Sequence, residues 1–189
     1  MRITGGQLTG LRIRSPRGRD IRPTSDRVRE ALFNILGQQL HDLRVLDLFA
    51  GTGALGLEAL SRGAAEVRFV DRSLHSRELI VKNLTLCRFQ ERGRFLQHDL
   101  LRGLPTDLLE PPVTFDLVFL DPPYILQGSV ETLETAAMKG ILSPGALAVI
   151  ETSRKTAPPE SIHWLWAVDT RIYGDTRLTF YQTVEEGQT

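Results

Sequence analysis

The stretch Phe-Asp-Leu-Val-Phe-Leu-Asp-Pro-Pro-Tyr at residues 115–124 decides the fold. Its apolar run predicts a β-strand that is buried on both faces, as strands of parallel sheets are. Pro122 and Pro123 cannot donate to a sheet ladder, so the strand must end before them, and the proline that follows Asp121 keeps this residue extended. We therefore predict a stiff corner at the carboxyl end of a buried strand, which is the end where ligands bind in open α/β sheets.

This corner carries acceptors that suit an amine. Asp121 and the carbonyl of Pro122 can accept the two N–H bonds of an exocyclic amino group on a nucleobase, and Tyr124 can stack on the ring. Such an amine is a weak nucleophile because its lone pair is delocalised into the ring. Two acceptors would favour a pyramidal nitrogen whose lone pair points at an electrophile, which is catalysis by positioning and electrostatics. The structural alternative is a proline-rich loop in which Asp121 is a turn residue.

Outward from this stretch, buried strands alternate with helices. This order predicts an α/β fold with a doubly wound, mostly parallel sheet of seven strands. The expected strands are 44–48, 66–70, 94–97, 117–120 and 146–150, with a closing antiparallel pair at 164–172 and 177–182, and the expected helices are 51–62, 73–88 and 129–139. In the closing pair, Trp164 and Trp166 share one face, which we interpret as sheet packing.

The N-terminal segment predicts a small β-hairpin over residues 2–14 and a helix that ends at Gly37. The helix is capped by Thr24, Ser25 or Asp26. Its expected buried stripe contains Val28, Leu32, Ile35 and Leu36. We expect residues 1–38 to form an arginine-rich extension, residues 39–183 the main domain, and residues 184–189 a polar tail.

Charge is distributed unevenly along the chain. The formal net charge is zero, yet residues 1–30 hold eight arginines against three acidic residues, a local charge of +5. The forked donors of arginine suit phosphate, so a polyanion contact is favoured over a solvated charged surface. The candidate polyanion-binding residues, for which the family resemblance given below implies RNA, are Arg2, Arg12, Arg14, Arg17, Arg19, Arg22 and Arg27.

The amino-acid composition further narrows the class of protein. The 189 residues are 41% hydrophobic, and no apolar run reaches membrane-spanning length. Cys87 is the only cysteine, which fits a reducing compartment, and the four histidines lack the spacing of metal ligands. We expect a cytoplasmic protein without a metal site, and a monomer because no apolar face is left over.

A glycine-rich turn predicts a nucleotide-type cofactor. Residues 51–56 match G-x-G-x-x-G after a strand, and Asp71 follows twenty residues later, where an acid can bind ribose hydroxyls. Asp47 would repel a pyrophosphate but suits the sulfonium and ammonium groups of S-adenosylmethionine. Successive predicted strands each end at an aspartate: Asp47, Asp71, Asp99 and Asp121. Four such acids at one sheet edge are hard to explain as ordinary solvated surface residues. The alternative role for Asp47 is to cap a helix.

Individual positions in this turn have expected roles. Gly51 and Gly53 would let the backbone approach the ligand, and Gly56 would allow close packing of helix on strand. Asp99 would meet the adenine amino group. The full set of candidate cofactor-binding residues is Asp47, Phe49, Gly51, Gly53, Asp71, Arg72, Asp99 and Leu100.

Residues 47–53 (DLFAGTG) together with 121–124 (DPPY) resemble the class I S-adenosylmethionine-dependent amino-methyltransferases. Residues 1–6 (MRITGG), 22–34 (RPTSDRVREALFN) and 56–64 (GLEALSRGA) look like a finer family, the bacterial small-subunit ribosomal RNA guanine-N2 methyltransferases called RsmD. The resemblance runs from Met1 to about Tyr181, and the block at 22–34 is its specific part.

The resemblance implies methyl transfer to the 2-amino group of one guanine in 16S ribosomal RNA (position 966 in the usual numbering of that RNA), within the small subunit or as free RNA. By this resemblance Asp121, Pro122 and Tyr124 are catalytic, S-adenosylmethionine is the cofactor, and the arginine-rich segment grips RNA phosphates. Such a guanine must leave its stack, which costs a few kcal/mol.

Three alternatives remain at this point. The first is methylation of another amine, such as adenine N6 in DNA or RNA, or a protein glutamine amide. The second is a nicotinamide-dependent oxidoreductase, which Asp47 disfavours. The third is an RNA-binding module with a vestigial cofactor pocket, which the intact glycines disfavour.

Overall fold

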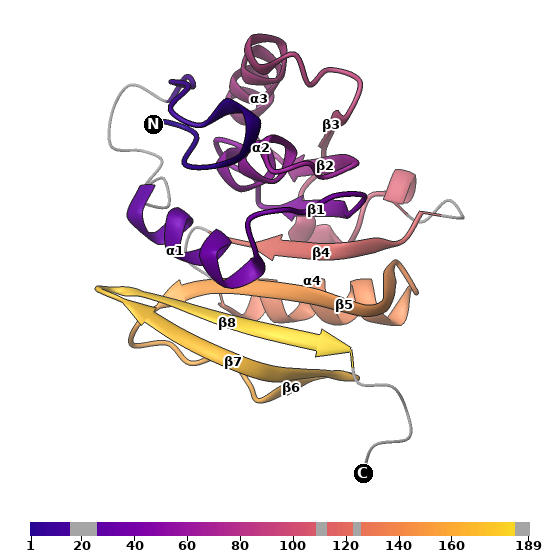
Figure 1. Cartoon of the computed structure of the whole chain (residues 1–189). Helices are drawn as coiled ribbons and strands as arrows, with labels where there is room; N and C mark the ends of the chain where they lie inside the picture. Colours follow the sequence, from indigo (N-terminus) through magenta and orange to yellow (C-terminus); the bar gives the residue numbers. More distant parts are fainter. Residues whose placement is uncertain (16–25, 109–112, 123–125, 184–189) are drawn as a thin grey trace.

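Eight strands form one sheet in the computed structural model of the chain, which describes residues 1–15, 26–108, 113–122 and 126–183 (Figure 1). The strand order is β3-β2-β1-β4-β5-β8-β7-β6. Strands β1 to β5 are parallel, whereas β8 is antiparallel to both of its neighbours, β5 and β7. The strands are β1 (Arg44–Leu48), β2 (Glu66–Asp71), β3 (Gly93–Gln97), β4 (Phe115–Leu120), β5 (Leu142–Ser153), β6 (Ser161–Ile162), β7 (Leu165–Tyr173) and β8 (Thr176–Thr183).

Helices cover both faces of the sheet. The α-helices are α1 (Asp26–Leu36), α2 (Ala54–Ser61), α3 (Leu74–Cys87) and α4 (Leu126–Met138), and short 3-10 turns are η1 (Gly6–Leu8), η2 (Leu100–Arg102) and η3 (Thr106–Leu108). One core packs α1, α2, α3 and the N-terminal segment against the sheet, and the other packs α4, η2 and η3 against the opposite face. The predicted doubly wound α/β class is therefore confirmed.

The strand count differs from the prediction by one. The described residues contain eight strands rather than seven, because Ser161–Ile162 pairs with Leu165 and Trp166 as the short edge strand β6. Two residues are too few to show an alternating pattern, so the sequence carried no signal for this strand.

Two expectations about burial are wrong. On α1, Ile35 is 39% exposed, while Phe33 and Arg29 are fully buried. The buried face of α1 therefore differs from the predicted stripe. It includes Arg29, which faces Glu58 of α2, and a pattern of hydrophobic residues does not anticipate a buried arginine. Trp164 and Trp166 are 39% and 52% exposed, so they do not pack into the sheet as interpreted.

The outer strand β7 leaves an apolar surface uncovered. Trp166, Val168 and Ile172 on this strand are each about half exposed. The argument that no apolar face is left over is therefore wrong, and the monomeric state stays a prediction without that support.

The N-terminal segment, defined here as residues 1–15, is a closed loop rather than a regular hairpin. A single bridge joins Arg2 to Arg12, and the turn between them contains η1. Ile3 and Ile13 point inward and are 1% and 5% exposed. The N–H groups of Ile3 and Ile13 donate to the carbonyls of Leu11 and Met1, so the segment packs on the helices with only a short antiparallel pairing of its own.

Gly56 confirms the predicted close packing of α2 on β2. A Cβ atom at this position would lie 2.3 Å from Cε1 of Phe69 and 2.7 Å from Cγ1 of Val67, both in the core. We expect Gly56→Ala to lower the free energy of unfolding by about 1–3 kcal/mol, because the overpacking outweighs the usual gain of alanine in a helix. Urea unfolding would measure the change.

A matched control lies on α4. A Cβ atom at Gly128 would meet only the tip of Leu101, a side chain that is 54% exposed and can rotate away. Gly128→Ala should therefore be neutral or stabilising. Equal urea midpoints for both variants would contradict the packing argument for Gly56.

Candidate active site

The strand order gathers the four strand-end acids at one edge of the sheet. Strands β3, β2, β1 and β4 are neighbours, and their carboxyl ends carry Asp99, Asp71, Asp47 and Asp121 in that order. In Figure 1 the arrowheads of β4 and β5 point to the side of the molecule on which the N-terminus and the start of α1 lie. This edge is where a doubly wound sheet binds its ligand.

The glycine loop between β1 and α2 has a strained backbone. Phe49, Gly51 and Gly53 have φ values of 59°, 52° and 72°, in the left-handed region. Glycine adopts this region freely, but a phenylalanine there is strained by about 1–3 kcal/mol. Phe49 is half-buried and packs against the core that contains α4. Strain of this kind is typical of a loop whose shape serves a ligand.

Asp71 fixes the shape of this loop. Its Oδ2 accepts the N–H of Gly51 at 2.8 Å, and its Oδ1 accepts the N–H of Ser73 at 2.8 Å. The carboxylate is half-buried at the end of β2. One acid therefore joins the glycine loop to the start of α3, and its remaining lone pairs can meet a ligand hydroxyl.

Asp47 is buried and caps α2. It is 2% exposed, and its Oδ2 accepts the N–H of Gly56 in the first turn of α2 at 3.0 Å. The helix-capping role that the sequence left as an alternative is therefore present. Burial raises the pKa of Asp47 well above its ordinary value of 3.8, the Gly56 N–H opposes this, and the charges of Asp121 and Asp71 raise the pKa further. The three carboxylates thus lie close enough to interact.

The raised pKa of Asp47 gives a pH-dependent prediction. A carboxyl group whose pKa is higher in the folded chain binds more protons there, so its contribution to stability falls as pH rises from about 4 through the raised pKa. Asp47→Asn removes this charge cost and leaves an oxygen for Gly56. We expect the melting temperature of the variant, relative to wild type, to be higher at pH 7 than at pH 4. A difference independent of pH would contradict the expectation.

Asp99, Leu100 and Arg72 border the same edge. Asp99 accepts the N–H of Leu101 through Oδ1 at 3.3 Å and lies 3.9 Å from Nε of Arg102. Leu100 is 4% exposed within the core. Arg72 is exposed, and its carbonyl accepts a hydrogen bond from the amide of Gln97. The three residues remain predictions as cofactor contacts.

The acid-proline corner follows β4 as predicted. Asp121 and Pro122 are half-buried directly after Leu120, which pairs with Leu48 of β1 and Ile150 of β5. A strand between two parallel neighbours gives this corner a rigid base. Pro123 and Tyr124 lie outside the described residues, so the predicted stacking role of Tyr124 stays a prediction.

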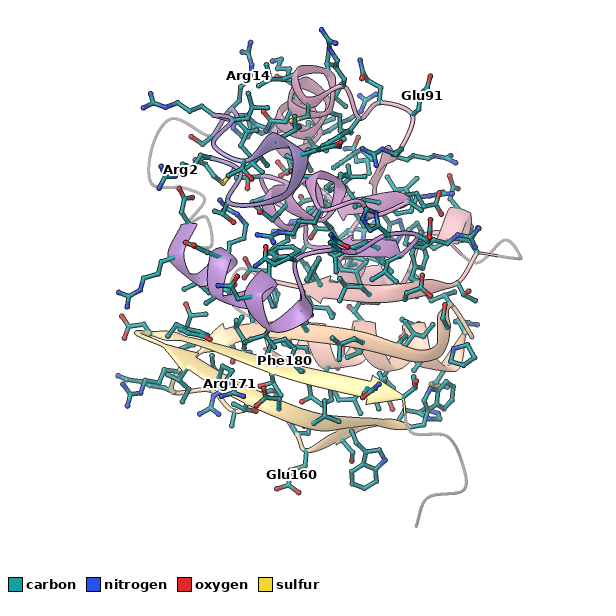
Figure 2. All side chains as sticks on the ribbon, in the orientation of Figure 1. Arg2, Arg14, Glu91, Glu160, Arg171 and Phe180 are labelled. Carbon is teal, nitrogen blue, oxygen red and sulfur yellow. The ribbon has the colours of Figure 1, made fainter. Side chains whose placement is uncertain are left out.

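The candidate RNA-binding arginines fall into two groups. Arg2, Arg12, Arg14 and Arg27 are exposed, and the bridge between Arg2 and Arg12 brings two of them together. Figure 2 shows the side chains of Arg2 and Arg14 pointing outward from the ribbon. Arg17, Arg19 and Arg22 lie outside the described residues, as do the proposed helix caps Thr24 and Ser25.

Sequence reasoning missed a buried ionic cluster between α1, α2 and the N-terminal segment. Glu58 and Arg29 are 0% exposed and Arg62 is 3% exposed. Glu58 accepts from Nε of Arg29 at 3.2 Å and from Nε of Arg62 at 3.1 Å. Glu58 and Arg62 are four residues apart on an otherwise apolar helix, which was the one available signal.

Fold and site together define a class I methyltransferase: a doubly wound sheet with a glycine loop after β1, an acid at the end of β2, and Asp-Pro-Pro after β4. In the described residues, no group of three or more His, Cys, Asp or Glu side chains could hold a metal ion, and no helix is long and apolar enough to cross a membrane.

Comparison with known proteins identifies the family. The model of the family "Conserved hypothetical protein 95", the RsmD family, matches residues 1–182, and the chain belongs to this family. "Ribosomal RNA small subunit methyltransferase D" of Escherichia coli is 32% identical over 189 residues, covering 100% of this chain and 92% of the relative. The protein of that name in Haemophilus influenzae is 34% identical over 157 residues, covering 82% and 79% of the two chains.

A solved structure has the same architecture. The Escherichia coli protein yhhF superposes with a TM-score of 0.83 at 30% identity, covering 98% of this chain and 99% of its own. The likeness therefore extends over the N-terminal segment as well as the sheet.

Proposed function

We propose that the chain transfers a methyl group from S-adenosylmethionine to ribosomal RNA of the small subunit. The observation that carries the proposal is the convergence of Asp47, Asp71 and Asp121 beside a strained glycine loop, in a chain whose full-length relatives are small-subunit ribosomal RNA methyltransferases. A substrate of this kind would place the protein in the cytoplasm, acting on free 16S ribosomal RNA or on the assembling subunit.

The residues at the strand ends fit S-adenosylmethionine. When bound, this cofactor supplies a methyl group on a positively charged sulfur. The acidic edge attracts that charge and the ammonium group, whereas it would repel a pyrophosphate. Left-handed Gly51 and Gly53 open the backbone to the ligand, and half-buried Asp71 can accept from the ribose hydroxyls. Asp99 can accept from an adenine amino group.

Asp121 and Pro122 would act on the acceptor amine. The carboxylate of Asp121 and the carbonyl of Pro122 would accept the two N–H bonds of the guanine 2-amino group, and Tyr124 would stack on the base. Holding both hydrogens on one side leaves the nitrogen lone pair pointing at the methyl donor. The half-buried position of the corner limits competing water, which strengthens both hydrogen bonds. The amine loses its proton after transfer, to Asp121 or to water.

The exposed arginines would hold the RNA backbone. A flipped guanine costs a few kcal/mol of stacking, and several phosphate contacts offset that cost. Arg2, Arg12, Arg14 and Arg27 are exposed on the side of the sheet that carries α1, α2 and α3. RNA held there would lie beside the strand ends.

Arg12 and Arg14 allow a direct test of this contact. We expect the double variant Arg12→Ala, Arg14→Ala to bind 16S ribosomal RNA more weakly. The slope of log K against log salt should become shallower by about 0.7–0.9 for each lost phosphate contact. Filter binding at several salt concentrations would measure it. The double variant Arg44→Ala, Arg94→Ala serves as the control, because both side chains are exposed at the amino ends of β1 and β3, away from the strand-end acids. An unchanged slope in the first variant would show that the two arginines face elsewhere.

A methyl-transfer assay tests the function itself. The protein would be incubated with labelled S-adenosylmethionine and three acceptors: small ribosomal subunits lacking the modification, naked 16S ribosomal RNA, and duplex DNA. We expect label in N2-methylguanosine from a ribosomal acceptor. Label only in N6-methyladenine or only in DNA would retain the chemistry and overturn the proposed substrate. Absence of transfer to every acceptor, despite cofactor binding, would overturn the proposed function.

A further inference from the structure

The backbone of the N-terminal segment is held by side chains of α2 and α3 as well as by its own short antiparallel pairing. Beside the bridge between Arg2 and Arg12, the N–H groups of Ile3 and Ile13 donate to the carbonyls of Leu11 and Met1 at 3.0 and 3.2 Å. This pairing leaves other backbone groups of the segment to be served by α2 and α3, on which it packs closely. A Cβ atom on Gly6 would lie 2.0 Å from the carbonyl oxygen of Ser61. The backbone groups of a segment that approaches so closely need partners that replace water.

Ser61 and Asn83 supply such partners in the same way. Ser61, at the end of α2, donates to the carbonyl of Gly5 at 2.7 Å and accepts the N–H of Leu8 at 3.0 Å. Asn83, in the middle of α3, accepts the N–H of Arg14 at 2.8 Å and donates to its carbonyl at 3.0 Å. Each side chain thus serves one N–H and one C=O, as a neighbouring strand would.

Glu58 and Arg29 form the third attachment. The carboxylate of Glu58 accepts the N–H of Thr4 at 2.9 Å, and Arg29 donates to the carbonyl of Arg2. We call Glu58, Ser61 and Asn83 the three clamps. They are 0%, 3% and 0% exposed, so water does not compete for their hydrogen bonds.

The clamped segment turns its arginines outward. Arg2 has 68% of its side chain exposed, and Arg12 and Arg14 are also exposed, whereas Ile3 and Ile13 between them are buried. The clamps bind only backbone at Arg14, so its guanidinium stays available. The segment also reaches the glycine loop between β1 and α2, since Sδ of Met1 lies 3.9 Å from Oγ1 of Thr52.

We propose that the clamps Glu58, Ser61 and Asn83 are positioning residues for RNA binding: they hold the segment so that Arg2, Arg12 and Arg14 stand at fixed positions beside the glycine loop. The inference rests on the proposed function and names the residues that organise its RNA site. A loop fixed before binding loses less conformational entropy when phosphates dock, so the clamps contribute to RNA affinity without touching RNA.

The salt dependence of RNA binding distinguishes a residue that positions the segment from a residue that contacts phosphate. Removing a phosphate-binding arginine lowers both the affinity and the salt slope, because fewer counterions are released. Loosening a clamp leaves the same arginines and the same contacts. The affinity should then fall equally at every salt concentration, with the slope unchanged.

The experiment uses the full chain with Ser61→Ala and Asn83→Ala, singly and together. The hydrogen bonds of these two side chains go to backbone groups of the N-terminal segment and not to the buried charges, so the variants keep the ionic cluster. The measurements are the dissociation constant for 16S ribosomal RNA at several salt concentrations, that for S-adenosylhomocysteine, and the melting temperature. Ile141→Val, a mild core change on the opposite face of the sheet, is the control for lost stability.

We expect the double variant to bind RNA on the order of tenfold more weakly with an unchanged salt slope and unchanged S-adenosylhomocysteine affinity. In turnover, the KM for RNA should rise while kcat stays within about twofold. RNA affinity equal to that of Ile141→Val at a similar melting temperature would overturn the inference, and so would a parallel loss of S-adenosylhomocysteine affinity. A wild-type chain that methylates no ribosomal RNA would instead overturn the proposed function, so the two failures are distinct.

Discussion

Asp121→Ala is expected to lower kcat for methyl transfer by about 10²- to 10³-fold while the affinity for S-adenosylhomocysteine stays within about twofold. The carboxylate would be one of two acceptors that hold the amine, and its loss leaves a flat nitrogen whose lone pair remains in the ring. The glycine loop, Asp71 and the Asp47 cap are untouched by this change, so the cofactor site keeps its shape. Single-turnover kinetics and calorimetry would measure the two quantities.

Asp116 provides the matched control on the same strand. It lies near the amino end of β4, where its Oδ2 accepts the N–H of Arg44 at 2.8 Å, far from the acid-proline corner. Asp116→Ala removes an equal charge and should leave kcat within a few-fold of wild type. A wild-type rate for Asp121→Ala would refute the positioning chemistry, and an equal loss in both variants would attribute the effect to the strand instead.

The second large effect is expected at Glu58. Glu58→Gln removes the carboxylate that buried Arg29 and Arg62 share. Arg29 keeps its ion pair with Asp26 at 2.9 Å, whereas the ion pair of Arg62 with Glu58 is lost. Breaking a buried ion pair in this way costs about 3–5 kcal/mol. For a domain of this size, the melting temperature should fall by roughly 6–20 °C. Far-ultraviolet circular dichroism during a thermal scan would measure the shift.

An exposed ion pair supplies the comparison. Glu78 and Lys82 are 3.3 Å apart on α3, with side chains that are 66% and 55% exposed. Glu78→Gln makes the same chemical change in water, where such pairs contribute about 0.3–0.5 kcal/mol. If both variants shifted the melting temperature by the same small amount, the cluster around Glu58 would not be a desolvated ionic network.

Local signals in the sequence predicted most of the sheet. The first strand was predicted at residues 44–48 and is observed there, because its short apolar run is followed closely by the glycine turn that begins at Gly51. The helix predicted at residues 73–88 is observed as α3, and Ser73 caps it, because its Oγ accepts the N–H of Ser76 at 3.3 Å. A buried strand and a helix cap are each encoded within a few residues, so short windows suffice.

Long-range polar contacts could not be predicted in this way. Glu58 meets Arg29 and Thr4, which are 29 and 54 residues distant, and no periodicity joins these positions. Counting charge along the chain treated Arg29 as part of an exposed basic segment, although its side chain is fully buried. Charge counts report composition, and only the fold decides which arginines face water.

The role of Asp47 shows a further limit of prediction from the sequence. Its position at a strand end indicated the acidic edge of the sheet, with helix capping as the alternative, and the sequence could not show that its carboxylate lies near Asp71 and Asp121 and also accepts the Gly56 N–H. The same residue serves both the helix and the charge of the site, and a choice between the two roles was unnecessary.

In the clamped N-terminal segment, attachment to the fold and contact with a ligand depend on different groups. These two properties usually constrain each other during evolution. Its attachment depends on backbone groups and on the side chains of Glu58, Ser61 and Asn83, whereas the residues that would meet a ligand point the other way. Arg2, Arg12 and Arg14 can therefore be exchanged with little effect on folding. A lineage could retune this surface for another nucleic acid, one substitution at a time, while every intermediate stays folded.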